Sequence, residues 1–438
     1  MKNIKIINLL LLIALLTQGL GAQELLTAED AIRKGLENNF SIRLVKQDAL
    51  IAGNNVKMGI ANFLPVLDID AVQNFSVLNT RQEYLSGQVN DLTGAKSDAF
   101  NAGAQLNWTL FDGMQMFVNY DRVKQFEQKS ELLVLLTVEA TINNILVNFF
   151  ELIHMKQQLQ VIEKTISVDL ERVKLANDML AIGAGSRLEV LQAEVDLNAD
   201  SALLMGIADR IDRARVNLNQ LLARPADVAF EVPDSFEVNK VLVKQTLEEK
   251  MLRQNTSLQL SLQDELLAQL TLREIRGRQS PTLGFNMGYN YINQSSESGF
   301  LQSNRSTGLT YGLNANLKIL DGLNTRRERN NATILLDASR IRTESLVSEL
   351  QAELTLNYNS YLNKLRLLAM ELQNVEAASE NLDIATERYR LGDLSGIEFR
   401  EAQRNFMTTE ARLLNVRLDI KTLEINLLQL AGDLPPEM

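Results

Sequence analysis

The chain has 438 residues, with 44 basic and 55 acidic side chains and a formal net charge of −11, which argues against a nucleic-acid partner. It contains no cysteine, which excludes disulfides, thiolate metal sites, cysteine nucleophiles and a lipid anchor on an N-terminal cysteine. Only six prolines occur, and none lies between positions 65 and 225 or between 281 and 435. Because proline breaks helix interiors, two very long blocks are free to be helical.

The first residues have the features of a secretory signal peptide. Lys2 and Lys5 supply positive charge, the stretch Ile6–Leu16 is almost entirely apolar, and small residues end at Ala22. The apolar run is too short to span a membrane comfortably. We expect residues 1–22 to be cleaved.

The remaining chain is a tandem repeat. Pro65 matches Pro281 at an offset of 216, and Asp112 matches Asp321 at an offset of 209, with many ordered matches around each pair. Each copy predicts a helix, a strand, a loop, a strand, a long helix, a glycine turn and a further helix. The expected boundaries are 23–224 for the first repeat, 225–246 for a linker, 247–432 for the second repeat and 433–438 for a tail.

Four stretches of about ten residues or more alternate apolar and polar residues, as a tilted transmembrane strand does. In the first, Leu67, Ile69 and Phe75 oppose Asp68 and Asp70. Half-buried strands of a soluble sheet show the same alternation, but four such strands rich in aromatic residues favour an outer-membrane barrel. Four strands cannot close a barrel and open edges are forbidden in lipid, so we expect the chain to oligomerise. The expected strands are about 66–80, 100–111, 282–293 and 307–320, with polar loops 79–99 and 293–306 facing the exterior.

The long blocks carry apolar residues at the four-three spacing of coiled coils. One seam starts at Leu354 and passes through Leu372, and another includes Val190, Asp200 and Leu204. The window 132–153 is apolar enough to suggest a membrane helix, but acidic and amide side chains interrupt it, so we predict helices of coiled-coil type.

Little in the sequence suggests catalysis or metal binding. His154 is the only histidine and has no companions at ligand spacing, so we predict no metal site and no cofactor. Strands of this kind joined to long helices could belong to a coiled-coil adhesive or structural protein anchored in the outer membrane, or to a simple porin. The first should not need a strand–helix repeat, and porins devote most of their chain to strands.

These features together resemble the outer-membrane efflux proteins of the TolC family. The resemblance covers nearly the whole chain after Gln23 and rests on Leu26–Ala31, on Leu110–Gly113 and on the glycine turns at 183–193 and 391–398. It implies a mostly α fold with a twelve-strand transmembrane β-barrel made by a trimer, four strands per protomer, above a helical barrel in the periplasm. It implies an exit duct rather than an enzyme, with a periplasmic adaptor and an inner-membrane efflux pump or ABC exporter as partners.

The resemblance also implies functional residues around the two glycine turns. Glu398 and Glu401 match acids that line the closed entrance, while Tyr389 and Glu189 match residues that tie this gate by hydrogen bonding. Leu394 replaces a gate arginine and Leu188 its polar partner, so the chain departs from the family pattern there. The residues expected to dock the adaptor are Gly183, Gly185, Ser186, Gly392, Asp393, Leu394, Ser395 and Gly396.

Overall fold

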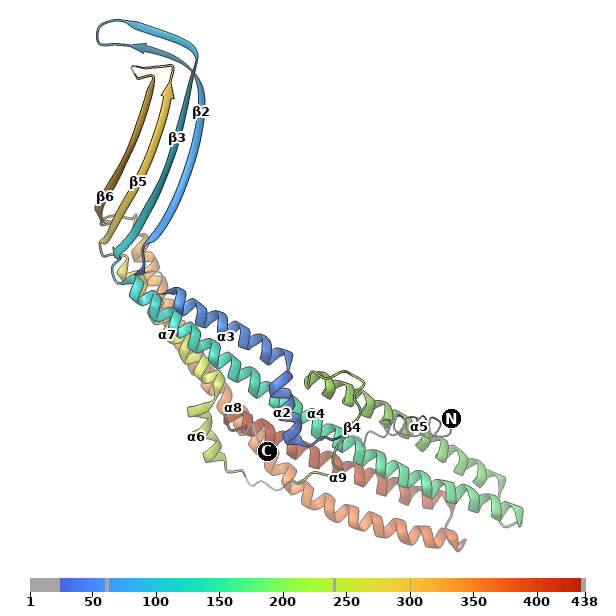
Figure 1. Cartoon of the computed structure of the whole chain (residues 1–438). Coiled ribbons are helices and arrows are strands. Elements are labelled where there is room, and N and C mark those ends of the chain that lie inside the picture. Colours follow the sequence, from blue (N-terminus) through green and yellow to red (C-terminus); the bar gives the residue numbers. More distant parts are fainter. Residues whose placement is uncertain (1–23, 60–62, 239–241, 300, 435–438) are drawn as a thin grey trace, which may run out of the picture. The chain divides into compact units, whose positions relative to one another are not determined.

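The computed structural model describes residues 24–59, 63–238, 242–299 and 301–434 (Figure 1). The predicted signal peptide, residues 1–22, lies outside these ranges. The chain divides into two compact units. One comprises Met1–Lys46, Leu133–Gln259 and Ser345–Met438, and the other comprises Gln47–Leu132 and Leu260–Glu344.

The helices and strands follow the predicted repeat. The first copy contains α2 (Ala28–Asn38), α3 (Phe40–Gly59), β2 (Val66–Glu83), β3 (Val89–Phe111), α4 (Gln115–Ala181) and α5 (Arg187–Leu221). The second contains α6 (Lys244–Gln254), α7 (Thr256–Gly277), β5 (Thr282–Ser296), β6 (Ser303–Asn316), α8 (Asn324–Arg390) and α9 (Gly396–Leu430). The tandem repeat and the mostly α architecture with a four-stranded antiparallel sheet are therefore confirmed.

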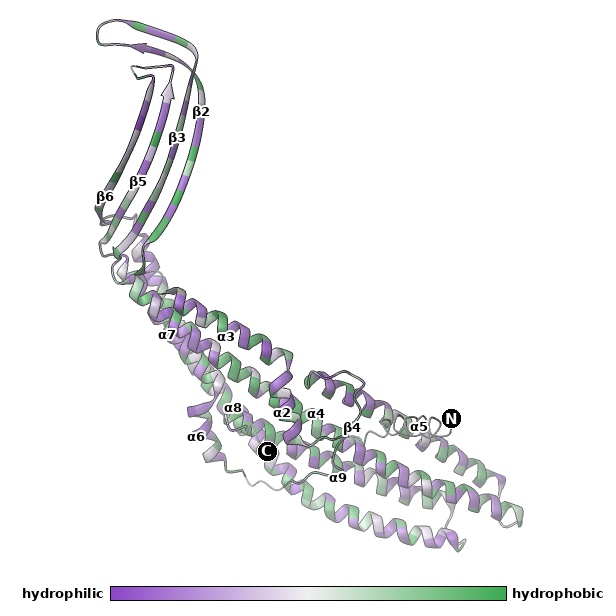
Figure 2. Ribbon diagram, viewed as in Figure 1, coloured by the Kyte–Doolittle hydropathy of each residue, from purple (hydrophilic) through white to green (hydrophobic). Residues whose placement is uncertain are grey.

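Four strands form an antiparallel sheet in the order β2-β3-β5-β6 (Figure 1). The register aligns Leu67, Leu106, Met287 and Tyr311 across the sheet, and directly paired residues share a face. On the opposite face Asp68, Gln105, Gly288 and Thr310 are aligned. Bands of opposite hydropathy alternate along the strands (Figure 2). The predicted apolar and polar faces are confirmed.

The strand ends differ from the expected ones. The expected loop 293–306 is shorter, because β5 continues to Ser296 and β6 begins at Ser303. Much of the predicted loop 79–99 is strand, because polar pairs such as Arg81 and Asp91 continue the β2–β3 ladder beyond the apolar part. Conversely, β6 ends at Asn316, where its partner β5 begins at Thr282. Pro281 precedes Thr282 and has no backbone N–H to donate, so residues 317–320 are not paired.

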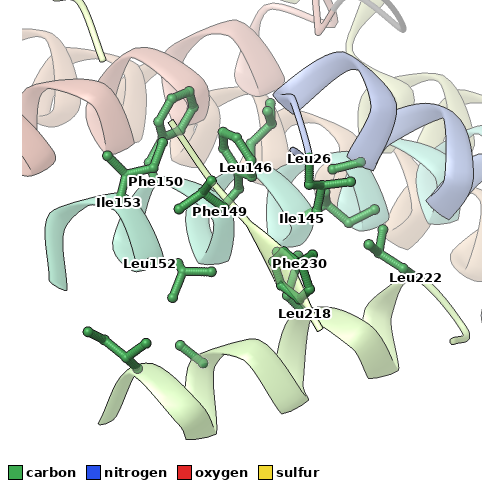
Figure 3. Packing of buried hydrophobic residues seen from close by; sticks show 14 of the residues in the cluster. Leu26, Ile145, Leu146, Phe149, Phe150, Leu152, Ile153, Leu218, Leu222 and Phe230 are labelled. Atoms are coloured by element: carbon green, nitrogen blue, oxygen red, sulfur yellow. The ribbon is translucent and has the colours of Figure 1, made fainter. Parts of the chain in front are cut away.

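The unit that contains α5 and α9 is held by a large apolar core. Ile145, Leu146 and Phe149 of α4 pack with Leu218 of α5 and with Phe230 (Figure 3). Within the described residues α4 alone is apolar and long enough to cross a membrane, with a mean hydropathy of 1.7 over its most apolar window. Its buried residues here form protein core.

The predicted linker 225–246 contributes to this core. It contains β4 (Phe230–Glu231), which pairs in parallel with β1 (Glu24–Leu25), and Phe230 is buried. Helix α6 begins at Lys244, within the last residues of the predicted linker. Val232 is buried in the same core, and the Asn219 side chain donates to the carbonyls of Ala226 and Val228 at 3.2 and 2.9 Å. Apolar packing and hydrogen bonds together hold this segment against the helices.

Candidate functional site: the helix-hairpin tips

Two helix hairpins end in turns of matching conformation. Gly183 lies between α4 and α5 with φ of 78°, and Gly392 lies between α8 and α9 with φ of 76°. Such positive values favour glycine. The Gly185 N–H donates to the carbonyl of Met179 at 3.0 Å and thereby closes the last turn of α4. In the second turn, Nε of Arg388 donates to the Asp393 carboxylate at 3.0 Å.

Both following helices begin with a capping box. The Ser186 hydroxyl accepts from the Glu189 N–H at 3.3 Å, and the Glu189 carboxylate accepts from the Ser186 N–H at 3.0 Å. Ser395 and Glu398 repeat the arrangement at 3.3 and 3.0 Å. Hydrogen bonds from the hydroxyl and then the N–H of Ser395 lower the pKa of Glu398. Two of the predicted gate carboxylates therefore hold helix starts within their own chain.

The Tyr389 side chain is buried in a small apolar cluster. Its ring stacks on Phe399 with centroids 5.0 Å apart, and Leu394 packs against the same small apolar cluster. Among the described residues Tyr389 and Glu189 share no hydrogen bond, so one chain alone does not bring together the pair that the resemblance implies. Leu394 supplies apolar contact where the family pattern has a cation.

Gly396 is buried where the two hairpins contact each other. A Cβ atom there would lie 3.4 Å from an Nη atom of Arg172 and 3.8 Å from the Tyr389 ring. The Arg172 guanidinium in turn lies 5.8 Å from the centroid of Phe399. Both are ordinary van der Waals distances, so a methyl group at position 396 would fit into this contact between α4 and α9.

A buried ionic cluster lies just behind the tips. Arg172 donates to Asp196 at 2.7 Å. Arg400 donates to both carboxylate oxygens of Asp200, at 2.7 and 3.1 Å, and lies 3.5 Å from Asp196. These residues come from α4, α5 and α9, so the cluster joins the two repeats.

Asp169 is the most deeply placed carboxylate of the cluster. Gln403 donates to its Oδ1 at 2.9 Å, while its Oδ2 and the Nε of Arg172 are buried without a hydrogen-bond partner. Burial raises the pKa of Asp169 to about 6, the Gln403 hydrogen bond opposes this rise, and the neighbouring Asp200 carboxylate adds to it. Within the described ranges no group of three acidic or histidine side chains is arranged to hold a metal ion.

Glu401, the remaining predicted gate residue, lies beside a groove of about 370 Å³ between α5 and α9. It is exposed, and the described part of the chain gives it no ion pair. The groove is lined by Arg172, Leu191, Gln192, Val195, Asp196, Ile397, Arg400, Glu401 and Arg404.

The sequence pattern does not predict the buried cluster, although it contains one signal of it. Asp200 occupies a seam position of the coiled-coil pattern, where an apolar residue is expected. A carboxylate in such a seam requires a buried cation as its partner. Arg400 is that cation, but it lies 200 positions away, and only the fold brings the two together.

Comparison with known proteins agrees with this architecture. The family model "Outer membrane efflux protein" matches residues 31–224 and 247–433. Nodulation protein T of Rhizobium leguminosarum bv. trifolii is 22% identical over 400 residues, which cover 87% of this chain and 80% of that protein.

Solved channel structures have the same fold. The Campylobacter jejuni CmeC outer membrane channel superposes with a TM-score of 0.78 at 16% identity, covering 93% of this chain and 86% of that one. The open state of the Neisseria gonorrhoeae MtrE outer membrane channel gives 0.73 at 17% identity, covering 94% and 90%. Because the family model covers both repeats almost completely, the chain belongs to the outer membrane efflux protein family.

Proposed function

We propose that this outer-membrane efflux channel, which is not an enzyme, is a homotrimeric exit duct. It receives substrates from a periplasmic adaptor and an inner-membrane pump or ABC exporter, and it conducts them passively to the exterior. The homotrimer is supported by the sheet: β2 and β6 are its two edge strands, and an unpaired edge is too costly in lipid to persist.

The observation that best supports an adaptor partner is the exposed apolar surface at the hairpin tips. Ile182 is 79% exposed, Leu188 64%, Leu391 81% and Ile397 68%. Ile182 and Leu391 directly follow α4 and α8, and Leu188 and Ile397 lie in the first turns of α5 and α9. All four are thus at the ends of the two hairpins, which in this proposal lie in the aqueous periplasm. Clustered apolar side chains in such a place are typical of a protein-binding surface.

We further propose that Glu398 and Glu401 form acidic rings at the entrance of the trimer, with Tyr389 and Glu189 restraining the helices when the entrance is closed. The capping box does not oppose this role, because a cap leaves the Glu398 carboxylate charged and solvent-exposed. Acidic rings in a narrow aqueous opening attract cations and repel one another.

The adaptor proposal can be tested by site-specific crosslinking, because the chain has no native cysteine. The variants Leu391→Cys and Ile397→Cys, coupled to a maleimide photo-crosslinker in the periplasm, should form an adduct with an adaptor. Leu356→Cys is the matched control: Leu356 is 68% exposed on α8, the helix that ends at Arg390 directly before Leu391. It lies 35 residues away, or about 50 Å along the helix.

The absence of adducts from both tip variants, or equal adducts from the control, would overturn the adaptor proposal. The same variants also test the adhesive alternative. A membrane-impermeant maleimide added to intact cells should label neither tip cysteine, because the proposed tips lie in the periplasm. Efficient labelling would place the helices outside the cell and favour the adhesive protein.

A further inference from the structure

The two junctions where strands lead into long helices have nearly the same backbone. In the first, Gly113 and Met114 have φ of 74° and 69°, and in the second Gly322 and Leu323 have 68° and 66°. In both, an aspartate carboxylate caps the helix: Asp112 accepts from the N–H of Met116 at 3.1 Å, and Asp321 from that of Thr325 at 2.8 Å. The duplication therefore provides an internal comparison between two matched sites.

The first junction is closed by aromatic packing. The Phe117 ring lies edge-on to Phe63 with centroids 5.1 Å apart, and Tyr120 lies edge-on to the same ring at 6.2 Å. Packing against Phe63 therefore explains why aromatic residues occur at positions 117 and 120 near the start of α4.

The second junction carries arginines instead. At the offset of 209, Arg326, Arg327 and Arg329 replace Phe117, Val118 and Tyr120. The position of Phe63 is taken at the offset of 216 by Gln279. The aromatic cluster of the first repeat has thus become a polar, basic site in the second, while the backbone has stayed the same.

In the described part of the chain these three arginines form no ion pair. Within the described ranges none of their side chains has a hydrogen bond or ion pair, and Arg326 and Arg327 are exposed. Glu328 lies between them but accepts from Arg278 at 2.9 Å. The first turn of α8 has no acidic residue, and cations near a helix N-terminus are unfavourable because the helix dipole is positive there. The cluster therefore concentrates uncompensated positive charge.

Apolar side chains adjoin the cluster on the side of the strands. Leu317, Ile319, Leu320 and Leu323 are all exposed. Figure 1 shows α8 beginning close to the end of β6, so these leucines and the isoleucine lie between the transmembrane strand and the arginines. Exposed apolar residues followed by cations are typical of a segment that crosses from hydrocarbon to the headgroup layer.

We propose that Arg326, Arg327 and Arg329 bind the phosphate groups of anionic phospholipids in the inner leaflet of the outer membrane. The helices extend into the periplasm, so this end of the sheet faces that leaflet. One guanidinium group can donate two parallel hydrogen bonds to a phosphate. Clusters of basic residues beside a membrane also attract anionic lipids. The first junction, with its aromatic cluster, lacks this site, so a trimer presents three lipid sites.

The test is native mass spectrometry of the purified full-length protein in detergent, titrated with phosphatidylglycerol or with phosphatidylcholine. Wild type should bind phosphatidylglycerol more tightly. The triple variant Arg326→Gln/Arg327→Gln/Arg329→Gln should lower that affinity by about tenfold or more and leave phosphatidylcholine binding unchanged. The variant Arg326→Lys/Arg327→Lys/Arg329→Lys should bind phosphatidylglycerol with an affinity between those of wild type and the glutamine variant. Lysine keeps the positive charge but loses the paired hydrogen bonds to phosphate.

The matched control is Lys164→Gln/Arg342→Gln/Arg366→Gln, which removes three exposed cations elsewhere on the long helices. It should behave as wild type does. Equal binding of the two lipids by wild type would overturn the proposal without any variant. An arginine-to-glutamine triple variant that binds phosphatidylglycerol as tightly as the control would overturn it as well.

Discussion

Arg400 of α9 donates two hydrogen bonds to the carboxylate of Asp200 of α5, at 2.7 and 3.1 Å. The two residues belong to different repeats, and both side chains are largely buried. The pair therefore fixes one helix hairpin against the other close to the proposed entrance. It also explains how two hairpins that expose apolar tips stay in a defined arrangement.

Loss of this cation should loosen the tips. Arg400→Gln leaves Asp200 and Asp169 buried without their main counter-charge, and removal of one partner from a buried pair costs about 3–5 kcal/mol. Hydrogen exchange across the start of α9 should rise strongly. Arg404→Gln, which removes an exposed arginine one turn away, should change local stability by less than about 0.5 kcal/mol. Equal exchange in the two variants would contradict a structural role for the Arg400 pair.

The raised pKa of Asp169, about 6, makes the stability of this region depend on pH. The unfolded chain ionises this carboxyl near its ordinary value of 3.8, whereas the folded chain retains the proton up to about 6. The folded state therefore binds more protons between these values, and its stability falls as pH rises through the window. Asp169→Asn should lack this fall.

The measurement is the thermal midpoint between pH 4 and pH 7. Asp178→Asn, an exposed change on the same helix, serves as the control and should follow wild type. Parallel curves for wild type and Asp169→Asn would show that the buried carboxyl does not titrate in this range.

The acidic entrance can be tested without disturbing the helix start. Glutamine at position 398 keeps the capping box, because its amide oxygen can still accept from the Ser395 N–H. Glu398→Gln/Glu401→Gln should therefore lower cation preference in planar bilayers and weaken block by trivalent cations. Glu376→Gln/Glu380→Gln, which neutralises two exposed acids on α8, should leave both properties unchanged. If the two double variants conduct alike, the tip acids do not line the entrance.

The restraint by Tyr389 and Glu189 predicts a different change. Tyr389→Phe/Glu189→Gln should raise conductance by loosening closure, while cation preference stays near that of wild type. Glutamine again preserves the cap, here with the Ser186 N–H. Unaltered conductance would remove these two residues from the gate.

The lipid-facing side of the sheet predicts a contrast between neighbouring residues. Leu313 of β6 is strongly exposed on the apolar face, while Asn314 pairs across the strands with Gly284 on the polar face. Leu313→Arg should destabilise the folded protein by about 2–4 kcal/mol if it lies near the bilayer midplane. Asn314→Arg should cost much less. Urea titration in lipid vesicles would measure both, and equal costs would mean that the faces are assigned wrongly.

Much of this fold follows from periodicity in the sequence. Two-residue alternation identified the four strands and their faces, and the paired Asp-Gly and glycine turns identified the repeat. Thr27, predicted to cap the first helix, accepts from the Asp30 N–H at 3.1 Å. These features depend on residues close together in sequence, which is why pattern alone reveals them.

Contacts between residues far apart in the sequence cannot be predicted from the spacing of apolar residues. The four-three spacing predicts that Leu372 lies in a coiled-coil seam. In the single chain Leu372 is exposed, and its neighbour Glu371 is buried instead. Arg412 of α9 donates to Glu371 at 3.1 Å and so makes that burial possible. The same holds for Phe230 in the predicted linker, whose core position depends on helices far away in the sequence.

Four strands per chain become a channel only by closing with other copies. The decisive measurement is native mass spectrometry of protein extracted from outer membranes into mild detergent. We expect a complex of three chains, with no folded monomer at equilibrium. A stable monomer that retains its sheet would refute trimeric closure, because it would leave the edges of β2 and β6 without partners.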